Sequence, residues 1–418
     1  MNSNPKDIDE ILKNLFNEDI KIKNFQLEER FKQRLEELQI TKHQVCKALG
    51  IENKTLDAVL SGESKKIDFI TITKLSNFLE TTPSNLIEKY FDLTLDTHNQ
   101  SIETAKTRSF IISNFDLPQL KKVGFIDGIN DFDLIEKKII NFFGYDTIFE
   151  FGQNKISAAL SSGKRKSGKK SLKFWFDTVY KSIEKTPNPH PYDREGLINY
   201  FPQIRSHSTD VENGMVAVAQ KLFKLGITLI IVPKFGSDAH LKGATFNYNG
   251  KPCIALTKYS MFYPTLWLTL IHELFHVLYD WKVIEEYNFH FSLDENQKND
   301  NEISEIINDS DIDEDEANDF AREYLFSKNK LNQVIPHIDE PLFIEKYAKE
   351  NHVHPSVIYS FYLWDNNRNN LYAKYHKYFP KESYQKLLNN FNVDNYLTAK
   401  PLKEINRTRN INLNYNTI

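Results

Sequence analysis

An apolar segment that carries two histidines, residues 265–281 (TLWLTLIHELFHVLYDW), places the tightest limit on how this chain folds. Apart from a few positions it is apolar throughout, so we expect a buried helix. His272 and His276 lie four residues apart, which places both imidazoles on one face of that helix. Two histidines buried without polar partners would be costly, so the pair needs either hydrogen-bond partners or a metal ion.

The spacing of the two histidines favours the metal ion. Imidazoles at positions i and i+4 suit two nitrogen ligands of a tetrahedral zinc. Glu273 is rotated by about 100° around the helix, so it points away from the ligands but can act as the general base of metal-assisted hydrolysis. The alternative is a pair of core histidines satisfied by hydrogen bonds alone.

A catalytic zinc needs a third protein ligand, and the segment EDEANDF (residues 314–320) offers candidates. Glu314 and Asn318 are four residues apart and share one helical face. We expect Glu314 to bind the metal and Asn318 to hydrogen-bond the far nitrogen of a ligand histidine. Glu316 points about 160° away from Glu314 and is the alternative third ligand.

Strands precede the histidine segment. ITLIIVP (residues 227–233) is an apolar run rich in β-branched residues; it follows Gly226 and ends at Pro233, so we expect a strand. GATFNYNGKPCIALT (residues 243–257) contains Asn-Gly at 249–250, a strong signal for a β-hairpin. We expect an extended peptide to pair with an edge strand near residues 243–248.

Taken together, the hairpin, the His-Glu-x-x-His helix and the Glu-x-x-Ala-Asn helix resemble the ImmA/IrrE family of zinc metallopeptidases over about residues 210–330. The resemblance implies His272, His276 and Glu314 as zinc ligands, Glu273 as catalytic base, and a partner regulator, often a repressor, as the protein that is cut. Two departures from the family are Phe275, where many members have glycine, and residues 324–327, Tyr-Leu-Phe-Ser.

A further histidine, His354, precedes Pro355 at the start of the segment PSVIYSFYLW. His354 or a neighbouring tyrosine could stabilise an oxyanion at the zinc site. The alternative is that His354 is a helix cap or a surface residue.

The N-terminal region has a dense series of short helices around TKHQVCKALGIENKTLDAVLSGE (residues 41–63), a helix-turn-helix pattern. Ala48 and Leu49 are expected to face inward, and Leu56 and Val59 to tie the second helix to the first. The pattern resembles the XRE/Cro type of DNA-binding domain over about residues 27–92, which implies double-stranded DNA and usually a homodimer. The alternative is a small bundle for protein contacts. The predicted DNA-binding residues are Lys42, Gln44, Asn53, Lys54, Thr55, Lys65 and Lys66.

The fold class we predict is multidomain, because 418 residues exceed one ordinary core. It combines an all-α helix-turn-helix domain, a helical middle region and an α+β zincin-like metallopeptidase domain with C-terminal helices. The predicted segments are an N-terminal helical extension (1–24), the helix-turn-helix (25–93), a linker (94–110), a helical connecting region (111–205), the peptidase (206–335), a C-terminal helical region (336–397) and a disordered tail (398–418).

Composition narrows the setting. Two cysteines far apart, Cys46 and Cys253, exclude a disulfide framework and favour a reducing compartment. A net charge of −4 limits any nucleic-acid surface to a local patch. The start MNSNPKDIDE is not a signal peptide, and no apolar run is long enough to cross a bilayer, so we expect a cytoplasmic protein with no membrane partner.

These features predict a DNA-binding regulator with an intrinsic zinc endopeptidase, and the resemblance to the ImmA/IrrE family implies that it cleaves a repressor or antitoxin in a stress or defence response. The alternative is a non-proteolytic repressor or antitoxin that uses the peptidase fold as a sensor or scaffold. In a third possibility the peptidase cuts the predicted linker of its own chain.

Overall fold

The structure is a computed structural model that describes residues 27–64, 66–153, 167–236, 241–258, 262–293, 314–365 and 370–415. The chain divides into two compact units, Met1–Thr107 and Arg108–Ile418. The helix predicted within residues 1–24 lies outside the described residues.

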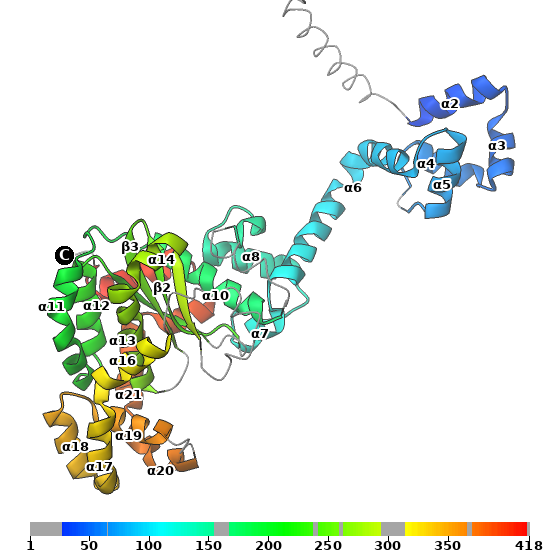
Figure 1. The fold of residues 1–418 in the computed structure, drawn as a ribbon. Helices are drawn as coiled ribbons and strands as arrows, with labels where there is room; N and C mark the ends of the chain where they lie inside the picture. Colours follow the sequence, from blue (N-terminus) through cyan, green and yellow to red (C-terminus); the bar gives the residue numbers. More distant parts are fainter. Residues whose placement is uncertain are drawn as a thin grey trace, which may run out of the picture. The chain divides into compact units, whose positions relative to one another are not determined.

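Every regular element in the described part of the N-terminal unit is a helix (Figure 1). Thr41 caps the second helix with a complete capping box, and Gly50 ends it in the left-handed conformation (φ 60°), as the sequence predicts. The third helix begins at Asn53 with Glu52 as its N-cap, one residue earlier than a helix capped by Asn53 would begin. The helices are α2 (Leu27–Leu38), α3 (Lys42–Leu49), α4 (Asn53–Leu60), α5 (Phe69–Phe78) and α6 (Pro83–Asn114).

The core of this unit lies between α2, α3, α4 and α5. Leu56 and Val59 are buried, which confirms that they tie α4 to its neighbours. Ala48 is exposed and Leu49 is only half-buried, so the prediction for Ala48 was wrong. Val45 and Cys46, one turn earlier on α3, fill the core instead.

The predicted linker, residues 94–110, is helical. It lies inside α6, which runs from Pro83 to Asn114. The polar composition suggested a linker, but no glycine or proline follows Pro83 in this stretch to interrupt a helix. A helix is also a poor substrate for a peptidase that binds extended chains, which argues against self-cleavage here.

The C-terminal unit contains the expected helical middle region, the strands and the later helices, and the predicted boundaries at 205 and 335 do not separate compact units. Its elements before the sheet are α7 (Leu117–Lys122), α8 (Phe132–Phe143), η1 (Ile148–Glu150), α10 (Ser167–Glu184), α11 (Arg194–Ile204), η2 (Arg205–Thr209) and α12 (Gly214–Lys224).

A mixed four-stranded sheet, of order β1-β3-β2-β4, lies at the centre of this unit. β1 is parallel to β3, and β2 is antiparallel to both β3 and β4. Asn249 and Gly250 join β2 to β3 with positive φ values of 54° and 76°, which confirms the predicted hairpin turn. The strands are β1 (Thr228–Pro233), β2 (Leu241–Tyr248), β3 (Lys251–Lys258) and β4 (Phe289–Leu293).

The two faces of the sheet belong to different parts of the core. Leu229 and Ile254 point to the face packed against α12 and α13 (Tyr263–Tyr279), whereas Ile230 and Cys253 point to the aromatic-rich face packed against α8 and α10. The remaining elements are α14 (Trp281–Tyr287), α16 (Glu314–Phe326), α17 (Lys328–Val334), η4 (Ile335–His337), α18 (Pro341–Glu350), α19 (Pro355–Trp364), α20 (Tyr372–Tyr375), η6 (His376–Tyr378), α21 (Lys381–Asn390), η7 (Val393–Thr398) and α22 (Leu402–Asn412).

The prediction of a disordered tail at 398–418 was wrong for the described part. Residues 402–412 form α22, and its Leu402 and Ile405 are buried against α10 and η7. Beyond it, the Tyr415 ring stacks on Phe223 at 4.0 Å between centroids. The Asn-rich composition concealed apolar residues at the spacing of a packed helix. Among the described residues, no helix is long and apolar enough to cross a membrane.

Candidate functional site

Helix α13 holds the two histidines in the interior of the C-terminal unit. Pro264 lies in the first turn, where proline is tolerated, and nearly every later residue is buried. His272 is 5% exposed and His276 is fully buried. The Nε2 atoms of the two imidazoles are 3.0 Å apart, so both rings point at one place, as their spacing predicts.

Helix α16 brings Glu314 to these histidines. Figure 1 shows α13 and α16 side by side, and Ala317 and Ala321 are fully buried between them. Such small residues let two helices approach closely. The Glu314 carboxylate at the start of α16 is 3.2 Å from His276 Nε2 through Oε1 and 3.5 Å from His272 Nε2 through Oε2.

The three side chains suit a zinc ion. Bonds of about 2.0–2.1 Å at tetrahedral angles put the ligand atoms of a zinc about 3.3 Å apart. The two Nε2 atoms are 3.0 Å apart, and the nearest Glu314 oxygen is Oε1 for His276, at 3.2 Å, and Oε2 for His272, at 3.5 Å. Each of the three side chains offers one ligand atom, and these atoms lie within 4.8 Å of one another. Among the described residues, this is the group of histidine, cysteine and acidic side chains that could hold a metal ion.

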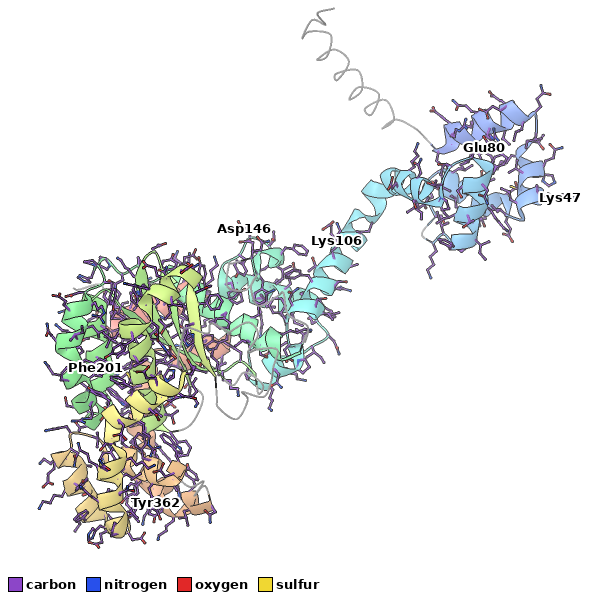
Figure 2. The ribbon with its side chains drawn as sticks, viewed as in Figure 1. Lys47, Glu80, Lys106, Asp146, Phe201 and Tyr362 are labelled. Atoms are coloured by element: carbon purple, nitrogen blue, oxygen red, sulfur yellow. The ribbon has the colours of Figure 1, made fainter. Side chains whose placement is uncertain are left out.

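Phe275 connects the two helices that carry these ligands. Its ring lies 5.3 Å from Phe320 of α16 and 4.6 Å from Tyr279, centroid to centroid. Phe320 in turn packs against Phe201 of α11. Phe201 is labelled in Figure 2. This phenylalanine, Phe275, one of the two departures from the family that the sequence resembles, therefore helps to fix α16, and with it Glu314, against α13.

The other departure, residues 324–327, also has a structural role. The Tyr324 ring packs on Phe201, and its hydroxyl accepts a hydrogen bond from the Arg205 amide. The Ser327 side chain caps α17. These residues secure the end of α16 and lie three turns beyond Glu314.

Glu273 lies on the side of α13 that faces β2. Its side chain is fully buried, and Thr245 donates a hydrogen bond to Oε2 at 2.8 Å. The other oxygen, Oε1, has no hydrogen-bond partner among the described residues. A buried carboxylate oxygen without a partner is costly, and it suits an additional group, such as a water held by a metal site, that the protein atoms do not supply.

Gly243 on β2 makes room for this carboxylate. A Cβ atom added there would lie 2.5 Å from Glu273 Oε1 and 2.8 Å from Thr269 Cγ2. Only glycine therefore lets β2 pass so close to α13. The sequence showed this glycine only as the start of a strand, because the approach depends on tertiary packing.

The charges in this cluster support each other. Burial lowers the pKa of His276, but hydrogen bonds to the Asp280 and Glu314 carboxylates, with the charge of Glu273, raise it to about 9. Burial raises the pKa of Glu314, but hydrogen bonds with His272, His276 and His290 hold it well below its usual range. Glu314 is consequently ionised at neutral pH, as a metal ligand must be.

Two residues at the cluster were not predicted. Asp280 accepts a hydrogen bond from His276 Nδ1 at 2.8 Å, the role expected of a residue that orients a ligand histidine. Its position four residues after His276 could have revealed it. His290 on β4 lies 2.6 Å from Glu314 Oε1, and no spacing in the sequence points to it. Asn318 is half-buried one turn after Glu314, and Glu316 is exposed.

The predicted edge for substrate is already paired. β2 is an inner strand, because β4 pairs with its outer side from Leu241↔Leu293 to Phe246↔Phe289. The prediction that a peptide adds directly to residues 243–248 was therefore wrong. Within the described part of the sheet, the edges are β1 and β4.

His354 is not at the metal cluster. It is the N-cap of α19, where Nδ1 accepts a hydrogen bond from the Ser356 amide at 3.1 Å. Its ring lies 5.7 Å from the ring of Tyr263, which begins α13. His272 is nine residues further along α13, or roughly 13 Å by helix rise, so the structure supports the cap and not an oxyanion role.

Replacement of His354 by asparagine is expected to reduce the pH dependence of stability. Burial lowers the pKa of His354 to about 4, so the unfolded chain binds more protons as pH falls from about 6.5 to 4, and stability falls with it. Between pH 7 and 5 the parent should lose about 2 kcal/mol more than His354→Asn, whose side chain still caps α19. All four tryptophans lie beyond residue 108, so tryptophan fluorescence during urea unfolding measures this unit. Identical pH profiles would contradict the assignment.

In the N-terminal unit, α3 and α4 form the predicted DNA-binding face. Asn53, Lys54 and Thr55 are exposed in the first turn of α4, as expected of a recognition helix. Lys66 is exposed, and Lys65 lies outside the described residues.

Two of the predicted DNA-binding side chains are engaged within the protein. Lys42 forms an ion pair with Asp57 of α4, and the Gln44 side chain accepts a hydrogen bond from the Thr41 amide at 2.7 Å. Gln44 is thus part of the capping box, a role that competes with base readout. The sequence could not separate these uses, because both need a polar side chain early in α3.

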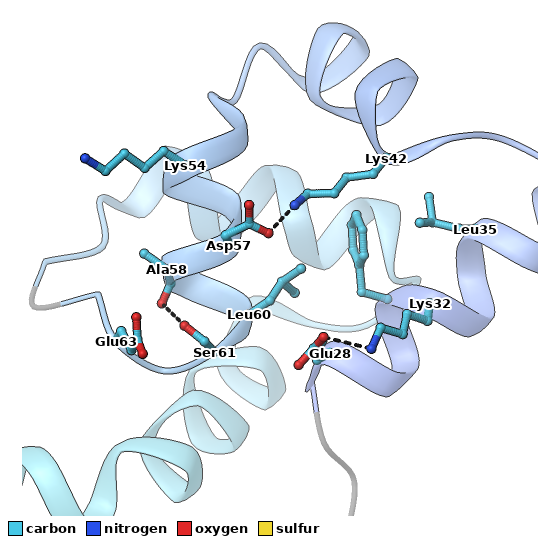
Figure 3. A pocket seen from close by; sticks show the side chains of 11 residues that line it. Glu28, Lys32, Leu35, Lys42, Lys54, Asp57, Ala58, Leu60, Ser61 and Glu63 are labelled. Atoms are coloured by element: carbon cyan, nitrogen blue, oxygen red, sulfur yellow. Dashed lines mark hydrogen bonds and ion pairs between the residues drawn. The ribbon is translucent and has the colours of Figure 1, made fainter.

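A hollow of about 560 Å³ lies between α2, α3 and α4 (Figure 3). Phe31, Leu35 and Leu60 form its apolar part, and Lys54 and the Lys42–Asp57 pair lie at its charged side. Three lysines and three acidic residues line it, so its charge is balanced rather than basic. The positive groups available to phosphates are therefore few.

Lys54→Ala is expected to weaken binding to a mixed-sequence DNA duplex and to reduce the slope of log affinity against log salt by about one. Lys54 is exposed at the start of α4, where its ammonium can reach a phosphate. Lys32→Ala is the matched control, since Lys32 is paired with Glu28 on α2. Fluorescence anisotropy over a salt series measures both slopes, and an unchanged slope for Lys54→Ala would exclude the contact.

A family model for the Cro/C1-type helix-turn-helix DNA-binding domain matches residues 30–92. No curated protein and no solved structure matches the chain. The match confirms the predicted class of the N-terminal domain and supports a DNA-binding regulator. The resemblance of residues 210–330 to the ImmA/IrrE peptidases stays a prediction.

Proposed function

We propose that the chain is a DNA-binding regulator with a zinc-dependent endopeptidase in its C-terminal unit. The observation that carries this proposal is the convergence of His272, His276 and Glu314, whose nearest nitrogen and oxygen atoms lie 3.0 to 3.5 Å apart, close to the spacing of ligand atoms around a tetrahedral zinc. Zinc at this place would polarise a peptide carbonyl and make a water more acidic.

The protein groups around this centre have distinct tasks. Glu273 takes a proton at Oε1, the oxygen without a partner among the described residues, and passes it to the leaving amine. Thr245 holds the other oxygen and so fixes the direction of the carboxylate. Asp280 orients His276, and the packing of Phe275 on Phe320 holds α16 in place.

The substrate we propose is a partner regulator, a repressor or antitoxin, cut in a stress or defence response. This class rests on the predicted resemblance and on the joining of a DNA-binding domain to the candidate site in one chain. We also propose that the DNA-binding domain acts as a homodimer, because helix-turn-helix domains of this kind bind paired half-sites.

A second candidate function is a non-proteolytic repressor or antitoxin in which the C-terminal unit is a sensor or scaffold. The specific observations in its favour are that Glu273 is fully buried and that β4 already pairs with the outer side of β2. A substrate that binds beside β2 would have to displace β4.

The experiment that tests the proposal compares the parent with Glu273→Gln in cells and as purified protein. Metal analysis of both proteins measures zinc per chain, and mass spectrometry of new N-termini identifies cleaved proteins. Zinc near one per chain with cleavage that only the parent performs supports the peptidase. Zinc without any cleavage, and with unaltered regulation by Glu273→Gln, favours the scaffold.

A further inference from the structure

His290 is a third histidine at the candidate metal centre, and the proposed mechanism does not use it. It lies on β4, is 5% exposed, and its ring contacts that of His276 at 4.4 Å between centroids. Its Nε2 atom lies 2.6 Å from Glu314 Oε1. His290 is therefore a buried histidine within hydrogen-bond distance of a candidate zinc ligand, and its function there has to be explained.

The register of the sheet explains how His290 reaches this place. His290 is directly opposite Thr245 in the β2–β4 pair, so both side chains project from the same face of the sheet, toward α13. Thr245 hydrogen-bonds Glu273, and His290 hydrogen-bonds Glu314. One cross-strand pair thus holds both carboxylates of the centre.

The geometry favours a hydrogen bond over a fourth ligand. Two atoms bound to one zinc lie about 3.3 Å apart, whereas 2.6 Å between Nε2 and Oε1 is a short, charge-assisted hydrogen bond. His290 is also outside the set whose ligand atoms lie mutually within 4.8 Å. Its Nε2–H therefore donates to Glu314.

A carboxylate can rotate and present either oxygen to a metal, so a donor that holds one oxygen leaves the other for the ion. We propose that His290 is a positioning residue that holds Oε1 of Glu314, so that the carboxylate is oriented for zinc before the ion arrives. This inference rests on the proposed zinc site. Partners of this kind typically contribute about 10- to 100-fold to metal affinity.

The test measures zinc affinity of the full chain by competition with a chromophoric chelator. His290→Phe keeps a ring beside His276 but removes the donor, and it is expected to bind zinc about 10- to 100-fold more weakly. His290→Gln places an amide donor near the position of Nε2, and it should recover most of that loss. His337→Gln is the control, because the half-buried His337 of η4 makes a similar pair with Glu340 at 2.9 Å, away from the metal centre.

Cobalt(II) in place of zinc tests whether His290 is itself a ligand. The visible absorption of the cobalt-loaded chain should keep its shape in His290→Phe, because the ligands are unchanged. Tryptophan fluorescence confirms folding, and His290→Ala replaces the Phe variant if that variant does not fold.

Three results would overturn the inference. They are parental affinity in His290→Phe, an equal loss in His290→Gln, and a changed cobalt spectrum. A parent that binds no zinc would instead remove the proposed metal site, and the inference with it.

Discussion

Glu273→Gln should abolish cleavage of the partner protein while zinc remains bound. Loss of a general base typically slows a reaction by about 10²- to 10⁴-fold. Glutamine keeps the size of the side chain and an acceptor for the Thr245 hydroxyl, but it cannot take up a proton. Since Glu273 is not among the three candidate ligands, the zinc content should stay at the parental value.

The informative comparison is with variants that remove the ligands. His276→Ala should lose both zinc and cleavage, whereas Glu273→Gln should lose cleavage alone. Thr245→Val, which removes the donor to Glu273 and little volume, should slow cleavage by a smaller factor. Full cleavage by Glu273→Gln would refute the assignment of this residue as the base.

Removal of residues 399–418 is expected to unfold the C-terminal unit. The deletion removes several side chains that are at most 4% exposed, among them Leu402, Ile405, Leu413 and Tyr415. Truncation of one such side chain typically costs about 2–5 kcal/mol, and a whole domain is stable by only about 5–15 kcal/mol. The deletion also leaves the hydroxyls of Tyr396 and Thr186 without the buried Arg409 guanidinium.

Tryptophan fluorescence during heating measures this effect, because all four tryptophans lie in residues 108–418. The control is a chain that lacks only residues 416–418, which retains Tyr415 and should melt with the parent. DNA binding by the N-terminal unit should survive in both. Cooperative parental melting of the longer deletion would show that α22 does not contribute to the core.

The parts of the site that could be predicted from the sequence are those in which the relevant residues lie within a single helix. His272 and His276 share a helix face because they are four residues apart. Glu314 begins a second helix, in which the apolar residues also recur with helical periodicity. The Asn249–Gly250 turn likewise depends only on local backbone preference. The class of the N-terminal domain was predictable for the same reason, since its caps and turns are local.

The parts that were missed depend on contacts between distant segments. β4 has only five residues, and its pairing with β2 brings His290 opposite Thr245, 45 residues earlier. The polar composition suggested a linker at α6, but the absence of glycine and proline after Pro83 is enough to allow a helix there. The Asn-rich composition suggested disorder at α22, but a few apolar residues are enough to pack this helix against the rest of the unit. Asp280 could have been predicted, because it follows His276 by four residues and so lies on the same face of the helix.

The packing of Tyr415 has a consequence for the order in which the chain acquires its activities during synthesis. The Tyr415 hydroxyl donates a hydrogen bond of 3.4 Å to the carbonyl oxygen of Leu229 on β1, which lies 186 residues earlier in the sequence. The Tyr415 ring stacks on Phe223. The first strand of the sheet is therefore incompletely covered until residue 415 has been synthesised. The helix-turn-helix, complete by about residue 92, can fold long before that. A nascent chain would acquire its DNA-binding domain before its fully packed C-terminal unit.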